Sequence, residues 1–172
     1  MMSFSFIISS CQRPFDNATV LLKIDTLQQL AKTIDQTLVL DEDAFKTRND
    51  SMIVKLNVVK PQIKDTTNGE TKSSIVRYDG IHENYEDFLK NYPLYEFDCD
   101  KHKKIVEDIK QNVLSKKMDQ PEFDKTYQSE KSFLESLLAK SKTMTYNTYS
   151  IEEDYRRTDP VVTKLYHEFS RK

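Results

Sequence analysis

The residues of this chain that are best suited to metal binding or catalysis lie in one short stretch, residues 98–102, which reads DCDKH. A thiolate, an imidazole and carboxylates are all groups that bind zinc in proteins. A structural zinc site, however, usually takes four ligands from two spaced pairs, and the remaining cysteine and histidines stand alone at Cys11, His82 and His167. We therefore expect no metal here, and we expect Asp98 or Asp100 to cap a helix instead.

A nucleophilic site could in principle combine a cysteine with a histidine and an acidic residue. Such a site needs the base within hydrogen-bond reach of the nucleophile and an orienting group behind the base. Glu83 follows His82 and Glu168 follows His167, but adjacent residues on a helix point about 100° apart. Neither pair is therefore ready-made, and no HExxH pattern occurs.

Glycine usage excludes several further classes of enzyme. The 172 residues include two glycines, Gly69 and Gly80. Loops that cradle phosphates need glycine where the backbone approaches an anion closely or takes a positive φ. No dinucleotide-binding loop, P-loop or nucleophile elbow can be built from two separated glycines. We predict that the protein is not an enzyme and that it uses no cofactor.

Basic and aromatic residues interleave over residues 140–157, a pattern that can hold single-stranded nucleic acid by stacking and phosphate contacts. The range contains Lys140, Lys142, Tyr146, Tyr149, Tyr155, Arg156 and Arg157. Three acidic residues, 152–154, interrupt it, and the whole chain carries 26 basic against 28 acidic residues. Because nucleic-acid binders usually show a basic excess, an accessory role on nucleic acid is the alternative hypothesis.

Composition indicates a polar protein of an intracellular, reducing compartment. Hydrophobic residues make up 37% and charged residues 31% of the chain, whereas typical domains have about 45–50% apolar and about 25% charged residues. The two cysteines form no paired framework, which favours free thiols. No apolar run is long enough to span a membrane. Because the chain is so polar, we expect part of it to be stabilised by contact with a partner.

The first half of the chain predicts a small mixed sheet. Four segments have strand-like composition or alternation, at residues 3–9, 18–24, 51–59 and 73–78. Asp25 and the apolar residues that follow it at helical spacing predict one helix between the second and third strands. Asn68-Gly69 is a hairpin signal. We therefore expect an α+β body of ββαββ order over residues 1–97, with a hairpin that projects near residues 60–72.

Helices dominate the second half. Apolar stripes predict a helical C-terminal extension over residues 98–172. Residues 141–149, SKTMTYNTY, have no apolar period and predict an extended link. Asp159-Pro160 is expected to begin the last helix, because proline favours the first helical position after a capping residue.

Aromatic residues concentrate around Pro93 and again in the link, and they predict a partner-binding surface. Phenylalanine and tyrosine supply large contact areas, and tyrosine keeps a polar tip. The predicted partner-binding residues are Tyr85, Phe88, Tyr92, Tyr95, Phe97, Tyr146, Tyr149, Leu165 and Phe169. The leading hypothesis is a non-catalytic subunit or adaptor of a larger intracellular assembly, which acts through contacts with other protein subunits.

Overall fold

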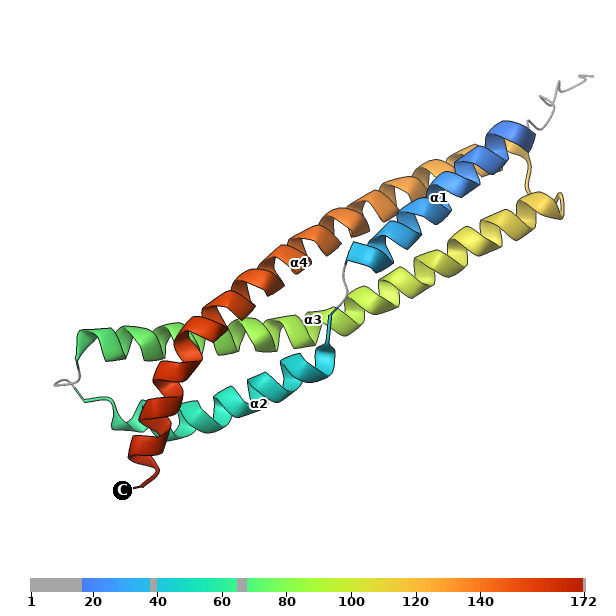
Figure 1. Cartoon of the computed structure of the whole chain (residues 1–172). Helices are drawn as coiled ribbons and strands as arrows, with labels where there is room; N and C mark the ends of the chain where they lie inside the picture. The colour runs from blue at the N-terminus through green and yellow to red at the C-terminus, as the bar shows by residue number, and fades with distance from the viewer. Residues whose placement is uncertain (1–16, 38–39, 65–67, 172) are drawn as a thin grey trace, which may run out of the picture.

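Long antiparallel helices form the protein. The computed structural model describes residues 17–37, 40–64 and 68–171. These residues form α1 (Asn17–Thr37), α2 (Glu42–Val59), the short 3-10 helix η1 (Lys60–Gln62), α3 (Gly69–Leu114) and α4 (Gln120–Phe169). Figure 1 shows α3 and α4 running antiparallel along the molecule, with α1 beside one half of the pair and α2 beside the other. Each half of the molecule is therefore a bundle of three helices.

The predicted α+β fold is wrong, because no residue that the structure describes lies in a strand. Residues 18–24 belong to α1, residues 51–59 to α2 and residues 73–78 to α3. The fourth predicted strand, residues 3–9, falls outside the described residues. Burial against neighbouring helices outweighs the strand preference of the β-branched residues in these segments.

The predicted hairpin is replaced by a helix start. The side chain of Asn68 accepts a hydrogen bond of 2.8 Å from the backbone N–H of Glu70, so Asn68 caps α3. Asp41 and Asp119 cap α2 and α4 in the same way, each accepting a bond of 2.9 Å from an N–H three residues on. Asn and Asp favour both turns and helix caps, and here the cap prevails.

A heptad repeat of buried side chains holds the helices together. In α3, buried residues recur at Tyr78, Tyr85, Tyr92, Cys99, Val106 and Val113, and again at Ile81, Phe88, Tyr95, His102 and Ile109. In α4, the corresponding series includes Phe123, Tyr127, Glu130, Leu134, Leu137, Ser141, Thr148, Thr158 and Val162. This spacing is that of coiled coils, in which two positions of every seven face the partner helices.

Two prolines lie in the interior of long helices, and one of them, Pro160, was expected to begin the last helix. Pro93 sits near the midpoint of α3, and Pro160 sits in the last third of α4. Each proline lacks the N–H that would bond to the carbonyl four residues earlier, which bends a helix. Figure 1 shows α3 changing direction about halfway along its length and α4 changing direction toward its C-terminal end.

The predicted extended link is also helical. Residues 141–149 lie within α4, where Ser141 and Thr148 occupy buried heptad positions. The proposed boundary between residues 97 and 98 falls inside α3, and Asp98 and Asp100 are interior residues of that helix rather than caps. The lack of an apolar period over residues 141–149 reflects hydroxyl-bearing side chains that fill core positions.

Candidate functional site

The predicted partner-binding residues divide into three groups by their exposure. Four of them, Tyr85, Phe88, Tyr92 and Tyr95, are buried in the chain's own core. Phe97, Tyr146 and Tyr149 are 69%, 73% and 71% exposed. Leu165 and Phe169 are half-buried against the core near the end of α4. Only the exposed group is free to contact another molecule without rearrangement.

The buried aromatic residues pack on one another across α2 and α3. The ring of Phe45 in α2 lies 4.9 Å from the ring of Tyr85 and 5.0 Å from that of Phe88, measured between centroids. Phe88 in turn stacks at 5.3 Å on Tyr92. Centroid separations in this range are typical of favourable aromatic pairs. The aromatic stretch before Pro93 is therefore a packed helix junction.

Two partly buried polar clusters connect α2, α3 and α4, and we name them the polar rungs. In the first rung, the carboxylate of Glu152 accepts hydrogen bonds from Arg48 and from the hydroxyl of Tyr85. In the second rung, Asp159 accepts a bond of 2.6 Å from the Lys55 ammonium and one of 2.5 Å from the Tyr78 hydroxyl. Each rung combines a cation from α2, a tyrosine from α3 and a carboxylate from α4.

The two rungs are related by one heptad on every helix. Arg48 and Lys55, Tyr85 and Tyr78, and Glu152 and Asp159 are each seven positions apart. The ring of Tyr155 lies between the rungs, with centroid distances of 6.3 Å to Tyr78 and 6.1 Å to Tyr85. A shift of one helix would leave buried charges unpaired, which is costly. The rungs therefore fix the register of the three helices.

Burial governs the acidity of the tyrosines near the rungs. Burial is the main cause that raises the pKa of Tyr78 and of Tyr85 above the usual 10, and hydrogen bonds to Asp159 and Glu152 add to the effect. Burial likewise raises the pKa of Tyr92 to about 12. These hydroxyls stay neutral over the whole physiological range, so they act as hydrogen-bond donors and not as bases.

Raised tyrosine pKa values predict a protein that is sensitive to alkali. Above about pH 10, the unfolded chain releases tyrosine protons that the folded chain retains, so the free energy of unfolding falls as pH rises. We expect the urea midpoint to be steady from pH 7 to about 8. It should fall slightly where the unfolded thiol of Cys99 titrates, because burial raises the pKa of that thiol in the folded chain, and it should drop more steeply above about pH 10. Urea titrations across this range, with tyrosinate absorbance as a second signal, test this. A midpoint that is unchanged up to about pH 11 would contradict it.

The DCDKH stretch contributes packing. His102 is buried, its Nδ1 lies 2.7 Å from Oε1 of the buried Glu130, and its ring stacks 3.7 Å from that of Phe133. Cys99 is a buried free thiol, and burial raises its pKa, which makes the reactive thiolate scarcer. Within the described ranges, no group of three or more His, Cys, Asp or Glu residues could hold a metal ion. Cys11 lies outside the described residues.

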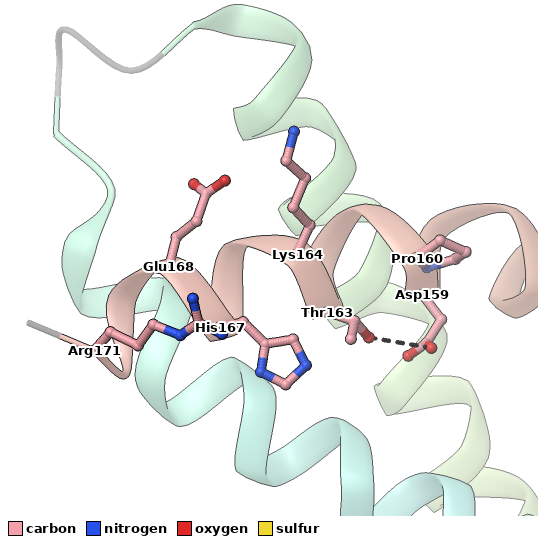
Figure 2. Close-up of a pocket in the computed structure, with 7 residues that line it drawn as sticks. All are labelled: Asp159, Pro160, Thr163, Lys164, His167, Glu168 and Arg171. Atoms are coloured by element: carbon pink, nitrogen blue, oxygen red, sulfur yellow. Dashed lines mark hydrogen bonds between the residues drawn. The ribbon is translucent and has the colours of Figure 1, made fainter.

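A shallow hollow of about 540 Å³ lies beside the end of α4. Its lining residues all belong to the C-terminal part of the chain: Asp159, Pro160, Thr163, Lys164, His167, Glu168 and Arg171. Figure 2 shows that Lys164 and Glu168 point to one side of the helix while His167 points to the other. Thr163 donates a bond of 3.3 Å to Asp159 of the second rung. The side chains do not converge on one point where a reaction could occur.

The basic and aromatic range 140–157 is a helix whose residues face different directions. Tyr155 points into the core between the rungs, whereas Tyr146 and Tyr149 point outward. Arg157 pairs with Asp154 at 2.7 Å, and the Lys140 ammonium lies 5.7 Å from the centre of the Tyr95 ring. The tyrosines and basic groups therefore do not form one continuous stacking face.

Two exposed apolar pairs stand near the middle of the molecule, and we name them the α3 patch and the α4 patch. The α3 patch is Leu94 with Phe97, and the α4 patch is Tyr146 with Tyr149. Members of each pair are three residues apart, so they lie on one face of their helix. Phe97 and both tyrosines are among the predicted partner-binding residues, whereas Leu94 is not, and the sequence analysis did not identify the polar rungs. The rungs could have been predicted from residues of like chemistry, two cations, two tyrosines and two carboxylates, each pair of which is seven positions apart.

Comparison with protein families, curated proteins and solved structures finds no match to this chain. None of the described helices has the length and apolar character that crossing a membrane requires.

Proposed function

We propose that the protein is a non-catalytic subunit or adaptor of a multiprotein assembly in an intracellular, reducing compartment. The observation that carries the proposal is the pair of exposed patches. Phe97, Tyr146 and Tyr149 leave about seven-tenths of their surface in solvent, although the same helices bury most of their other aromatic side chains. Aromatic residues are enriched in protein interfaces and supply many of their energetic hot spots.

The spacing of the patches suits recognition by another helix or by a groove. Anchors at i and i+3 on an exposed helix face are a common means of helix recognition. The long helices also hold the patches rigidly, because the polar rungs and the heptad core fix the helices behind them. Rigid anchors lose little entropy on binding. Cys99 and His102, which the sequence analysis considered for chemistry, are buried inside this scaffold.

The test is a gentle purification of the tagged protein from its source cell, in four forms. The wild-type chain is compared with L94S/F97S, with Y146S/Y149S and with the matched control V76S/L114S, whose two residues are exposed on α3 away from the patches. We expect a partner in stoichiometric amount with the wild type and with the control. Loss of a hot spot worth about 2 kcal/mol lowers affinity roughly 30-fold, so recovery should fall with at least one patch variant.

Two outcomes would overturn the proposal. Equal recovery with all variants would show that the patches are not the interface, and a clean monomer would show that no partner exists. Recovery of nucleic acid that is lost at high salt would favour the alternative accessory role through Lys140, Lys142, Arg156 and Arg157.

A further inference from the structure

The outward face of α3 carries a second heptad series, which we name the α3 seam. Its seven members are exposed and follow one another at alternating spacings of four and three residues: Glu83, Asp87, Lys90, Leu94, Phe97, Lys101 and Lys104. The buried residues of α3 repeat with the same spacing on the opposite side of the helix. The seam therefore has the geometry with which one helix packs along another.

Charge along the seam is separated by sign around an apolar centre. The first two members are acidic and the last two are lysines. Between them lie Lys90 and the α3 patch, whose Leu94 and Phe97 are 63% and 69% exposed. None of the five charged side chains of the seam belongs to an ion pair within the described part of the chain. The seam thus presents unneutralised charge on both sides of an exposed apolar pair.

A second copy of the chain, running antiparallel, complements this pattern. In an interface with two-fold symmetry, residue i of one copy contacts residue j of the other, and the reverse contact also forms. With the two-fold axis at Leu94, Asp87 faces Lys101 of the second copy, since both are seven positions from the axis. Glu83 and Lys104, eleven and ten positions from the axis, face one another in the same way. Two ion pairs therefore form on each side of the axis.

The centre of the seam also matches a second copy. Leu94 contacts Leu94 of the second copy at the axis. Lys90 and Phe97 are four and three positions from the axis, so the ammonium of one copy lies beside the aromatic ring of the other, whose face attracts a cation. Removal of the apolar pair from water favours association, and the flanking ion pairs set the direction and register of the two helices.

Other pairings of the same seam oppose like charges. A parallel pair of helices in register would set every lysine against itself. An antiparallel pair with its axis at Phe97 would set Lys90 against Lys104. The same shift would set Asp87 against Asp108, which is also exposed. Because like charges placed against one another disfavour association, the order of charges selects the antiparallel pairing that was described first.

We propose that the protein forms a symmetric antiparallel dimer through the α3 seam. The inference rests on the proposed function in one respect, that the α3 patch is an interface, and it makes a second copy of the chain the occupant of that patch. The α4 patch stays available to another subunit. Pro93 lies beside the axis, so the bend of α3 (Figure 1) affects both sides of the dimer alike, and the long, flexible lysine side chains reach across helices that diverge. One pair of helices buries a small area, so the dimer should be reversible and should depend on concentration.

Sedimentation equilibrium of the purified full chain tests the seam by charge reversal, with a reductant present to exclude disulfide-linked dimers. E83K/D87K places lysines against lysines, and K101E/K104E places carboxylates against carboxylates. Each variant should therefore dimerise at least about tenfold more weakly than the wild type. All four positions are exposed, so the variants should keep the circular dichroism spectrum of the wild type.

Mixing the two variants separates a specific seam from a general effect of charge. In a dimer of one E83K/D87K chain with one K101E/K104E chain, every ion pair of the seam again joins opposite charges. The mixture should therefore dimerise more strongly than either variant alone.

A matched control reverses two exposed lysines outside the seam. K125E/K142E makes the same change in charge on α4 as K101E/K104E makes on α3, and it should dimerise as the wild type does.

Three outcomes would overturn the dimer: a wild-type chain that stays monomeric at all concentrations, reversal variants that dimerise like the wild type, or a mixture that does not recover. The adaptor role would still stand after any of them if the tagged chain co-purified with a different protein. A dimer that behaves as expected, with no other protein recovered from the cell, would support the seam and contradict the adaptor role.

Discussion

Replacing Tyr85 with alanine should lower the free energy of unfolding by about 3–5 kcal/mol, the range seen when large aromatic residues are truncated in a core. The Tyr85 side chain is fully buried, its ring packs on Phe45, and its hydroxyl donates to Glu152 of the first rung. Alanine would leave a cavity and would remove one donor from the partly buried carboxylate of Glu152. Urea unfolding, followed by far-ultraviolet circular dichroism, measures the change.

Tyr146→Ala is the matched control for this variant. Tyr146 is 73% exposed, so its truncation should change the free energy of unfolding by no more than about 0.5 kcal/mol. The contrast between two tyrosines in the same chain separates core packing from surface contact. Similar losses for both variants would mean that the heptad face of α3 is not the buried face.

Replacing Asp159 with alanine should lower the free energy of unfolding by about 2–3 kcal/mol, because a partly buried ammonium would lose its counter-charge. Asp159 accepts hydrogen bonds from Lys55, whose side chain is 13% exposed, and from Tyr78. Asp124→Ala is the control, since the Lys23–Asp124 pair is more exposed and exposed ion pairs contribute little to stability.

At acidic pH, the difference in stability between Asp159→Ala and the wild type should disappear. Burial by itself would raise the pKa of Asp159, but the hydrogen bonds from Lys55 and Tyr78 outweigh it and hold the pKa below the usual 3.8. A carboxyl group with a lowered pKa stabilises the fold above its unfolded pKa, and the stabilisation is lost as pH falls through the folded value. Urea midpoints of both forms should therefore converge below about pH 4. A gap that stays constant into acid would contradict the ionic account of the rung.

Sequence patterns predicted the helices of the second half but missed the length of those helices. Stripes such as Ile109 with Val113 and Leu134 with Leu137 are genuine core positions. Asp159-Pro160 predicts a helix start because proline favours the first helical position, and a proline such as Pro93 removes a hydrogen bond from a helix interior. Packing on neighbouring helices compensates for one lost bond in a helix of 46 or 50 residues, and propensity alone does not contain that compensation.

The strand prediction at residues 51–59 failed because a short apolar run fits two periods. Met52, Val54, Leu56 and Val58 alternate as in a strand, yet Val54 is 54% exposed. A longer window shows Phe45, Met52 and Val59, all buried, at heptad spacing. Helix and strand cannot be separated by periodicity over so few residues.

Sequence reasoning identified aromatic residues of interest but could not sort them into core and surface. Tyrosine suits both places, because it combines a large apolar ring with a polar tip. Tyr85 and Tyr146 therefore cannot be told apart by residue type, and only their positions in the heptad repeat distinguish them. The polar rungs were missed for a related reason, since their cation, tyrosine and carboxylate come from helices that are far apart in sequence.

Chemical nitration of the native chain, mapped by mass spectrometry, tests this arrangement most directly, because it reads the exposure of each tyrosine in one experiment. The structure predicts that Tyr146 and Tyr149 react first, while Tyr78 and Tyr85 stay protected until the protein unfolds. That order would confirm a heptad bundle with Tyr78 and Tyr85 inside and the α4 patch exposed outside. Reaction of Tyr78 and Tyr85 as fast as Tyr146 would contradict the fold and, with it, the proposed interaction surface.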